Sequence, residues 1–298
     1  MVPNPTYAAY RAGSAIARAL PNTAVDPFGA AAGRIASRAM NGRRAMVARH
    51  QQRVRPELTG KELDRAVDAV FRSYADYWVE SFRLPGTSPE VLDAGMRTDG
   101  FEYLKDAYDA GNGVICAMPH LGAWEWAAFW LTAVHGIDVT TVVEQIDPPE
   151  LAQWFISLRE KLGMEIIPLG KDSGARVASA LGAGRWLTLL CDRDVGGGGI
   201  EVEFFGERTT LPAGPATLAL RTGAPLIAAT VYFDGDGHYG VARPPIDTSR
   251  QGKLREDVTR VTQDLAHELE ALIRYAPEQW HLLQPNWPSD HAVVEAGR

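Results

Sequence analysis

The sequence is poor in cysteine and has no long apolar run. Its two cysteines, Cys116 and Cys191, lie far apart in apolar stretches. They predict buried free thiols and exclude a disulfide framework or the usual zinc-ligand spacing. The richest apolar stretch, residues 127–134, is about two helical turns long, whereas a membrane-spanning helix needs about 20 residues. The N-terminus also lacks the apolar core of a signal peptide, so we expect a cytosolic protein with no transmembrane helix.

Acidic residues are almost absent from the first 56 positions. This segment contains nine arginines, no lysine and one acid, Asp26, which gives it a formal charge of +8. The whole chain carries −7, so the other 242 residues carry −15. A net charge of −7 would argue against anionic partners, but its uneven distribution describes an acidic body attached to a basic N-terminal segment.

The pattern of the chain changes near residue 95. Before it, Ala-rich stretches at about 7–20 and 27–52 and an amphipathic stretch at about 63–82 predict helices. From residue 113 onward, short apolar runs alternate with helix-like segments, which is typical of βα units around a mostly parallel sheet. The expected strands are 113–118, 139–143, 165–168, 186–191 and 225–233, and the expected helices are 123–135, 149–162, 174–181, 213–222 and 253–275, the last after a hairpin near 234–237.

These elements predict an α/β fold in which helices flank a central, mostly parallel β-sheet. Composition agrees, because 46% hydrophobic and 22% charged residues are ordinary for a folded chain of this length. We expect a helical region at 1–95 and an α/β core at 96–298, both within one structural domain.

The segment from Val114 to Trp126 carries the clearest chemical signal. An apolar strand runs into Pro119-His120 and a helix follows, which places His120 at the carboxyl end of a strand, where ligands of parallel sheets bind. If Glu125 lies in the first helical turn, its carboxylate reaches back to His120 Nδ1 and leaves Nε2 as a general base for an alcohol that attacks an acyl carbonyl. Spacing alone favours the alternative, a histidine that caps the helix and a glutamate near its positive end.

His120 and Glu125 resemble the HX4D/E motif of the bacterial glycerolipid and lipid A acyltransferases. Further segments over about residues 95–288 resemble, in family order, one branch of that superfamily, the phosphatidylinositol mannoside acyltransferases of actinobacteria. These segments are Val142-Val-Glu144, Leu158-Arg-Glu-Lys-Leu-Gly163, Cys191-Asp-Arg-Asp194, Glu201-Val-Glu-Phe-Phe-Gly206, Leu211-Pro-Ala-Gly-Pro215 and Gln279-Trp-His-Leu-Leu-Gln-Pro-Asn-Trp287. Several ordered blocks are more specific than any single motif.

The resemblance implies a catalytic set and a fold of the glycerolipid-acyltransferase type. His120 would be the base and Glu125 its orienting carboxylate. Asp192 would belong to the same charge relay, at a position where this branch usually has the longer Glu.

The resemblance also implies binding residues. The acceptor head group would be bound by Glu144, Arg159, Arg193 and Asp194, since an arginine fork suits a phosphodiester; the alternative for Arg159 is a solvated helix face. Backbone near Gly198 and the side chain of Arg221 would contact the acyl donor, although Arg221 replaces a usual acidic residue and alternatively caps a helix end. The aromatic residues that follow His120 would line an acyl channel or pack in the core; they are Trp124, Trp126, Phe129 and Trp130.

No cofactor or metal is expected, because a thioester donor such as acyl-CoA is already activated and no His/Cys/Asp cluster has zinc spacing. The glycine run 196–199 lacks the Lys-Ser/Thr of a phosphate-binding loop. The N-terminal arginines alternate with small apolar residues and not with stacking aromatics, which favours an anionic membrane surface over nucleic acid as their partner. Their alternative is again a solvated helix face.

Taken with the resemblance, these features imply a peripheral enzyme on the cytoplasmic face of the cell membrane. It would move a fatty acyl chain, palmitoyl in the family, from acyl-CoA to a mannose hydroxyl of a phosphatidylinositol mannoside, a glycolipid acceptor. Three alternatives stay open: another glycerolipid or lipid A acyltransferase that uses acyl-ACP, an acyl thioesterase, and a membrane-binding scaffold without activity.

Overall fold

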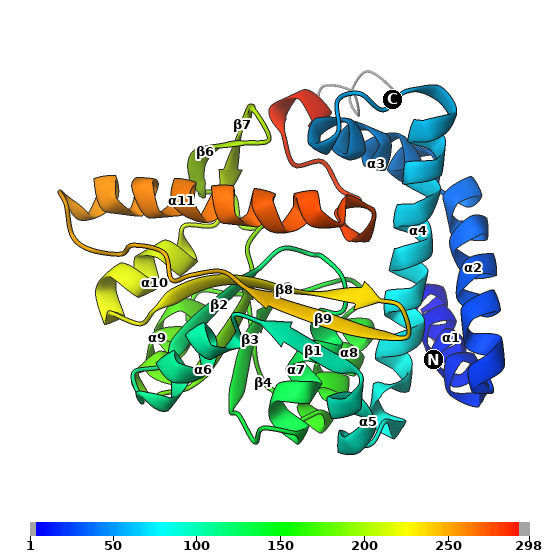
Figure 1. The fold of residues 1–298 in the computed structure, drawn as a ribbon, viewed down its shortest axis with the longest axis horizontal. Coiled ribbons are helices and arrows are strands. Elements are labelled where there is room, and N and C mark those ends of the chain that lie inside the picture. The colour runs from blue at the N-terminus through cyan, green and yellow to red at the C-terminus, as the bar shows by residue number, and fades with distance from the viewer. Residues whose placement is uncertain (1–3, 292–298) are drawn as a thin grey trace.

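A seven-stranded sheet runs through the middle of the molecule in the computed structural model, which describes residues 4–291 (Figure 1). Its strand order is β1-β9-β8-β2-β5-β3-β4. The strands are β1 (Met96–Asp99), β2 (Val114–Met118), β3 (Val139–Val143), β4 (Glu165–Pro168), β5 (Trp186–Leu190), β8 (Leu226–Asp234) and β9 (Gly237–Ala242). Neighbouring strands are parallel except at the β8–β9 hairpin. The predicted α/β fold with a mostly parallel sheet is therefore confirmed.

Strand β2 lies at the centre and is buried on both faces, which explains its uninterrupted apolar sequence. Its side chains alternate between two cores: Val114, Cys116 and Met118 face one, while Ile115 and Ala117 face the other. The first core contains side chains of α6 (Phe101–Asp109) and α7 (Trp124–Ala133), and the second contains those of α9 (Ser173–Gly182), α10 (Gly214–Thr222) and α11 (Leu254–Tyr275). The remaining elements of this part are α5 (Pro89–Ala94), α8 (Pro149–Lys161), the hairpin β6 (Ile200–Phe204) and β7 (Glu207–Leu211), and the 3-10 turns η1 (Leu84–Gly86) and η2 (Pro277–Gln279).

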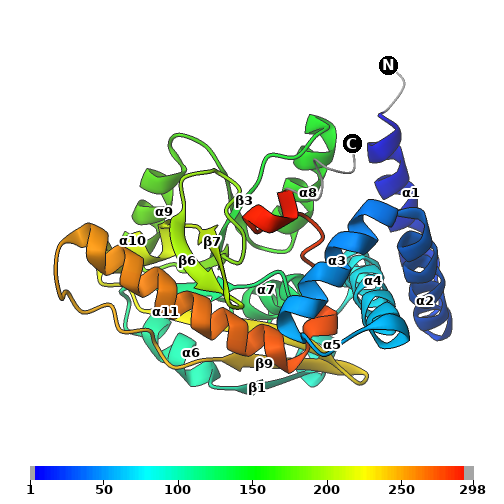
Figure 2. The same cartoon turned by 90° about the horizontal axis from the view of Figure 1, so that it is seen from above.

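Four helices precede the sheet: α1 (Pro5–Ala19), α2 (Asn22–Ala39), α3 (Asn41–Val54) and α4 (Gly60–Arg83). Helix α4 lies between the sheet and the outer pair α1 and α2, as the two views show (Figures 1 and 2). Within residues 4–291, no helix is both long enough and apolar enough to cross a membrane.

The strands and helices expected from residue 113 onward are confirmed, with ends that differ by one or two residues. The single helix expected at 27–52 is wrong, because the chain leaves helical geometry at Met40 and forms α2 and α3. Asn41 and Gly42 have weak helix propensity. Helix α3 turns away from the direction of α2 and contacts the C-terminal segment, residues 276–291 after α11. Strand β1 is short and mostly exposed, so it has no apolar pattern to reveal it.

Glycines allow α2 to approach α4 closely. At Gly33, a methyl group in place of the α-hydrogen would lie 2.7 Å from Arg72 Cα and 2.8 Å from the Phe71 carbonyl oxygen. Both are backbone atoms of α4, so the contact cannot be relieved by a side-chain rotation.

We expect Gly33→Ala to lower the free energy of unfolding by about 1–3 kcal/mol, because the two helix backbones must move apart. Gly42→Ala is the matched control: it lies in α3 with no atom within 4 Å of the added methyl, and should stabilise the protein by up to about 1 kcal/mol. Urea titration of the three proteins measures both effects. Equal stability of the two variants would show that α2 does not pack on α4 in this way.

Candidate active site

His120 and Asp192 meet at the carboxyl ends of two adjacent strands. Strands β2 and β5 pair in parallel with Met118 opposite Leu190, and each functional residue follows its strand by two positions. His120 Nδ1 lies 2.6 Å from Asp192 Oδ1, and the His120 backbone N–H donates to Asp192 Oδ2 at 3.0 Å. The parallel register therefore creates the contact directly, and the shorter Asp reaches the imidazole.

The Asp192 carboxylate is completely buried, with 0% of the residue exposed. Trp280 Nε1–H donates to its Oδ2 at 2.8 Å, and Asn286 Nδ2–H donates to the Asp192 backbone oxygen at 3.0 Å. Burial opposes ionisation, but the charge and hydrogen bonds of His120 and the Trp280 N–H together lower the pKa of Asp192 below its usual range. Asp192 is thus an ionised acceptor.

The protonation of the His120 ring follows from this partner. An ionised carboxylate only accepts, so Nδ1–H donates a hydrogen bond to Asp192, and Nε2 is left as the ring nitrogen that can act as a base. The His120 side chain is 25% exposed, and its ring lies edge-on to Trp124 at 5.8 Å between centroids. Such a ring can remove a proton from a group that approaches from the open side.

Glu125 does not contact His120 Nδ1, which corrects the expectation drawn from the motif. It lies in the first turn of α7, is 7% exposed, and accepts hydrogen bonds from Arg159 Nε at 2.9 Å and from the Tyr77 hydroxyl at 3.2 Å. The helix directs the glutamate toward α4 and α8, while the loop directs His120 toward β5. Burial and the negative charge of Glu125 raise the pKa of Tyr77 well above its usual value, so Tyr77 remains a donor.

Arg159 lies in the last turn of α8 and does not form a solvated helix face. Its side chain is 21% exposed and its guanidinium is paired with Glu125. Burial disfavours its charge, but the charge and hydrogen bonds of Glu125, together with Tyr77, raise the pKa of Arg159. As it stands, Arg159 ties α8 to α7.

The other predicted acceptor residues divide into two groups. Glu144 follows β3 and forms an ion pair at 2.7 Å with Arg193, the residue after Asp192. This pair lies near the surface. Asp194 instead accepts the backbone N–H groups of Gly197, Gly198 and Gly199 at 2.8–3.1 Å. Its carboxylate shapes the glycine loop, and the Gly198 amide is already used.

Arg221 is not brought to His120. It is exposed in the last turn of α10, which leads into the first residues of β8. Since β8 runs parallel to β2, that turn lies at the amino ends of the strands, whereas His120 lies at the carboxyl end. The sequence order of the motifs gave no information about which edge each one occupies.

An apolar cavity of about 60 Å³ lies between the sheet and α7. Its wall includes Met118, two residues before His120, and Trp124, whose ring contacts His120. Trp130 and Trp186 also line it, while Trp126 stacks on His238 at 4.1 Å and is part of the core. Of the aromatic residues after His120, Trp124 and Trp130 therefore line this cavity, whereas Trp126 packs in the core.

Trp280 and Asn286 are site residues to which the sequence assigned no role. Both belong to the block 279–287 that resembles the acyltransferases, and that resemblance was the available signal. The same block contributes His281, whose backbone N–H donates to the His120 carbonyl oxygen at 2.7 Å. Burial, together with the charge of His120, lowers the pKa of His281 to about 3, so its ring is neutral.

Comparison with known proteins agrees with the motifs. The family model of the bacterial lipid A biosynthesis acyltransferases matches residues 3–289. A phosphatidylinositol mannoside acyltransferase of Mycolicibacterium smegmatis is 38% identical over 286 residues, which are 94% of this chain and 91% of that protein. Proteins of the same name from two strains of Mycobacterium tuberculosis are also 38% identical, over 234 residues that cover 76% of this chain and 72% of each relative.

The buried Glu125–Arg159 pair generates a stability prediction. We expect Arg159→Met to lower the free energy of unfolding by about 3–5 kcal/mol, because it leaves a buried carboxylate without its cation. The double variant with Glu125→Leu should recover much of that loss, and Arg221→Met, at an exposed position, should stay within about 0.5 kcal/mol of the parent. Chemical denaturation measures all three, and an unchanged stability of Arg159→Met would contradict the pairing.

Proposed function

The chain belongs to the bacterial lipid A biosynthesis acyltransferase family, and on that basis we propose that it moves a fatty acyl chain, palmitoyl in our proposal, from acyl-CoA to a mannose hydroxyl of a phosphatidylinositol mannoside. The acceptor is taken from the names of the mycobacterial relatives. The observation that carries the chemistry is the His120–Asp192 pair at the carboxyl edge of the sheet. It supplies a positioned base beside an apolar cavity.

In the proposed reaction, His120 Nε2 removes the proton of the mannose hydroxyl while Nδ1–H stays bonded to Asp192. The oxygen then attacks the thioester carbonyl carbon, a C–O bond forms, and the C–S bond breaks. The imidazolium returns its proton to the departing sulfur, so the ring ends as it began. Asp192 stabilises the imidazolium and holds the ring in the productive tautomer without taking the proton itself.

The apolar cavity supports an acyl substrate. Its wall begins beside His120 at Trp124 and continues over the sheet to Trp130 and Trp186, a lining that suits an alkyl chain and offers little to a sugar. In this proposal the chain enters past the partly buried ring of Trp124, which lies beside His120 and lines the cavity. No cofactor takes part, since the thioester is already activated.

The glycolipid head group is assigned to the outer rim. Glu144 and Arg193 lie there as a partly exposed ion pair, which can open to offer a guanidinium to the phosphodiester and a carboxylate to sugar hydroxyls. We assign Arg159 and Asp194 no direct contact, because their charged groups are already paired within the protein. In this proposal the loop near Gly198 contacts the acyl donor.

A membrane surface is the proposed partner of α2, on the cytoplasmic face of the cell membrane. The outward side of α2 carries Arg34, Arg38 and Ile35, and Ile35 is 68% exposed. Met40 follows at the end of the helix. By contrast, Arg44 forms an ion pair with an acid of α4, Arg49 with one of the C-terminal segment, and Arg53 with one of β7. Cationic and apolar side chains on one helix face suit an anionic leaflet.

His120→Ala should lower acyl transfer by about 10²- to 10⁴-fold, because the base is removed while the fold is kept. The assay measures transfer of the label from acyl-CoA to lipid in a mixed glycolipid extract. Mass spectrometry then identifies the lipid product. His267→Ala, an exposed histidine of α11, is the control and should be as active as the parent.

The same assay separates this function from its rivals. Rapid hydrolysis of acyl-CoA that glycolipid does not change would indicate a thioesterase, and a preference for acyl-ACP would indicate another branch of the family. Near-normal transfer by His120→Ala would refute the proposed base.

Reversing charge on α2 should release the protein from anionic vesicles. We expect the variant Arg34→Glu, Arg38→Glu to bind at least about tenfold more weakly, since each basic residue near the surface contributes about 1 kcal/mol. Arg176→Glu with Arg255→Glu makes the same charge change at exposed positions of α9 and α11. Equal loss of vesicle sedimentation in both variants would show that net charge alone causes the effect. No loss in either variant would show that α2 is a solvated helix face and does not bind the membrane.

A further inference from the structure

The segment after α11 reaches Asp192 with two side chains although it has almost no regular structure. Trp280 donates to the Asp192 carboxylate and Asn286 to its backbone oxygen, at 2.8 and 3.0 Å. Apart from the short turn η2 and an isolated bridge between Leu121 and Trp280, separate hydrogen bonds hold this segment, such as those of the Gln279 side chain to the Phe233 backbone of β8. Something other than a strand ladder must therefore fix where Trp280 and Asn286 lie.

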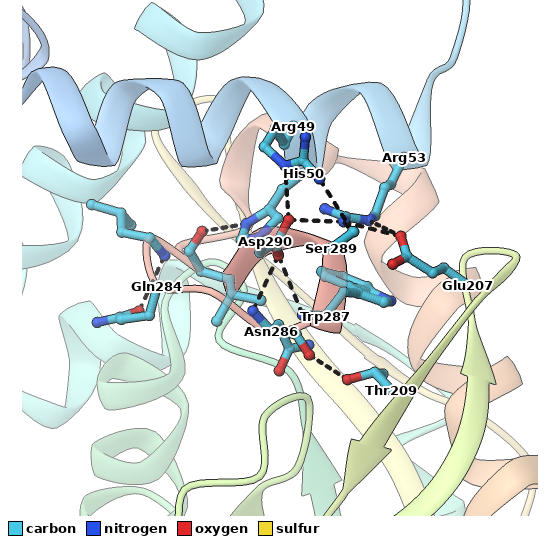
Figure 3. A network of polar contacts seen from close by, with 12 residues as sticks. Arg49, His50, Arg53, Glu207, Thr209, Gln284, Asn286, Trp287, Ser289 and Asp290 are labelled. Atoms are coloured by element: carbon cyan, nitrogen blue, oxygen red, sulfur yellow. Dashed lines mark hydrogen bonds and ion pairs between the residues drawn. The ribbon is translucent and has the colours of Figure 1, made fainter. Parts of the chain in front are cut away.

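Asp290 is one of the residues that fix this segment, and it is itself 0% exposed. Its Oδ2 accepts the backbone N–H groups of Asn286 and Trp287 at 3.2 and 3.3 Å, which closes the turn that presents the Asn286 side chain. Its Oδ1 accepts Arg49 Nε at 2.9 Å and Arg53 Nη2 at 2.8 Å (Figure 3). One carboxylate thus joins the turn 286–290 to helix α3.

His50 makes the second attachment between α3 and this segment. Its Nε2 lies 3.2 Å from Asp290 Oδ2 and its Nδ1 lies 2.9 Å from the Leu282 carbonyl oxygen. Its ring packs on Trp280 and Trp287 at 5.5 and 5.3 Å between centroids. Helix α3 therefore holds the segment on both sides of Asn286 and also contacts the Trp280 ring that bonds Asp192.

Because the Asp290 carboxylate is buried, the attachment of the turn 286–290 to α3 allows only one geometry. Two arginines and a histidine converge on one carboxylate in the interior, where each group depends on the others for its hydrogen bonds. Arg53 also covers the Trp287 ring at 4.1 Å. A cluster of this kind defines one arrangement of the turn, because a shifted turn would leave a buried charge without a partner.

We propose that Asp290 is a positioning residue for acyl transfer: by fixing the turn 286–290 to α3, it holds Asn286 and Trp280 against Asp192 and thereby orients His120. The proposal rests on the function assigned above to the His120–Asp192 pair. Asp290 touches neither substrate nor His120, and it acts through two contacts on Asp192. Displacement of a catalytic group by about 1 Å can cost about 100-fold in rate, so the anchor matters beyond its stabilising effect.

The test compares turnover per folded molecule in Asp290→Asn and Asn286→Ala. Both should lower kcat, by about tenfold to 100-fold, and leave KM for acyl-CoA and for the glycolipid near the parent values, because the substrate surfaces are unchanged. Asn286→Ala keeps the backbone N–H that Asp290 accepts, so it tests the link even if Asp290→Asn folds poorly. Circular dichroism and denaturant titration give the folded fraction.

The double variant decides whether the two residues act through the same contact. If they do, the loss of kcat in Asp290→Asn with Asn286→Ala falls well short of the product of the two single effects. Glu207→Gln is the matched control: Glu207 pairs with Arg53 in the same cluster but has no contact with the turn backbone or with Asp192. It should lower stability without lowering kcat.

Three results would overturn the inference: unchanged kcat per folded molecule in both single variants, multiplicative effects in the double variant, or an equal loss of kcat in Glu207→Gln. His120→Ala is assayed in parallel to separate this inference from the proposed function. Turnover that depends on His120 but not on Asp290 would refute the positioning role alone. Turnover that does not depend on His120 would refute both.

Discussion

The buried carboxylate of Asp192 sets the geometry on which the rest of the site depends. An ion in the interior is stable only if donors surround it, and here the donors come from distant parts of the chain: the loop after β2 gives the imidazole and a backbone N–H, and the C-terminal segment gives Trp280. The sheet, the loop and the C-terminal segment must therefore fold together before the His120 ring has its final orientation.

The parallel sheet explains why a histidine and an aspartate 72 positions apart face each other. Adjacent parallel strands end at one edge, so residues that follow them by equal numbers of positions become neighbours. The same rule separates Arg221 from His120, because the helix before a strand ends at the opposite edge. A second rule separates Glu125 from His120: the first turn of α7 directs its side chain toward α4 and α8, where Arg159 and Tyr77 receive it.

The arginines of the basic N-terminal segment form two groups in the structure. Some of its arginines, such as Arg44 and Arg53, pair with acids of the body and fasten the helices to it. Others, such as Arg34 and Arg38, are exposed on the outer face of α2. The formal charge of +8 therefore overstates the positive charge on the surface of the helices, since arginines such as Arg49 and Arg53 pair with acids and hold α3 against the C-terminal segment.

The sequence by itself determined the fold class, the ends of most strands and helices after residue 113, and the family, because apolar periodicity and ordered motifs are local properties of the chain. It also selected His120 and Asp192 as candidate site residues, which the structure places in contact. Only the tertiary structure decided that Asp192 rather than Glu125 contacts Nδ1, that Arg159 is paired with Glu125, and that Trp280 and Asn286 bond Asp192 while Asp290 bonds the Asn286 backbone. Hydrogen bonds form across space between segments far apart in sequence, so their partners follow from strand register, helix direction and burial, none of which a motif contains.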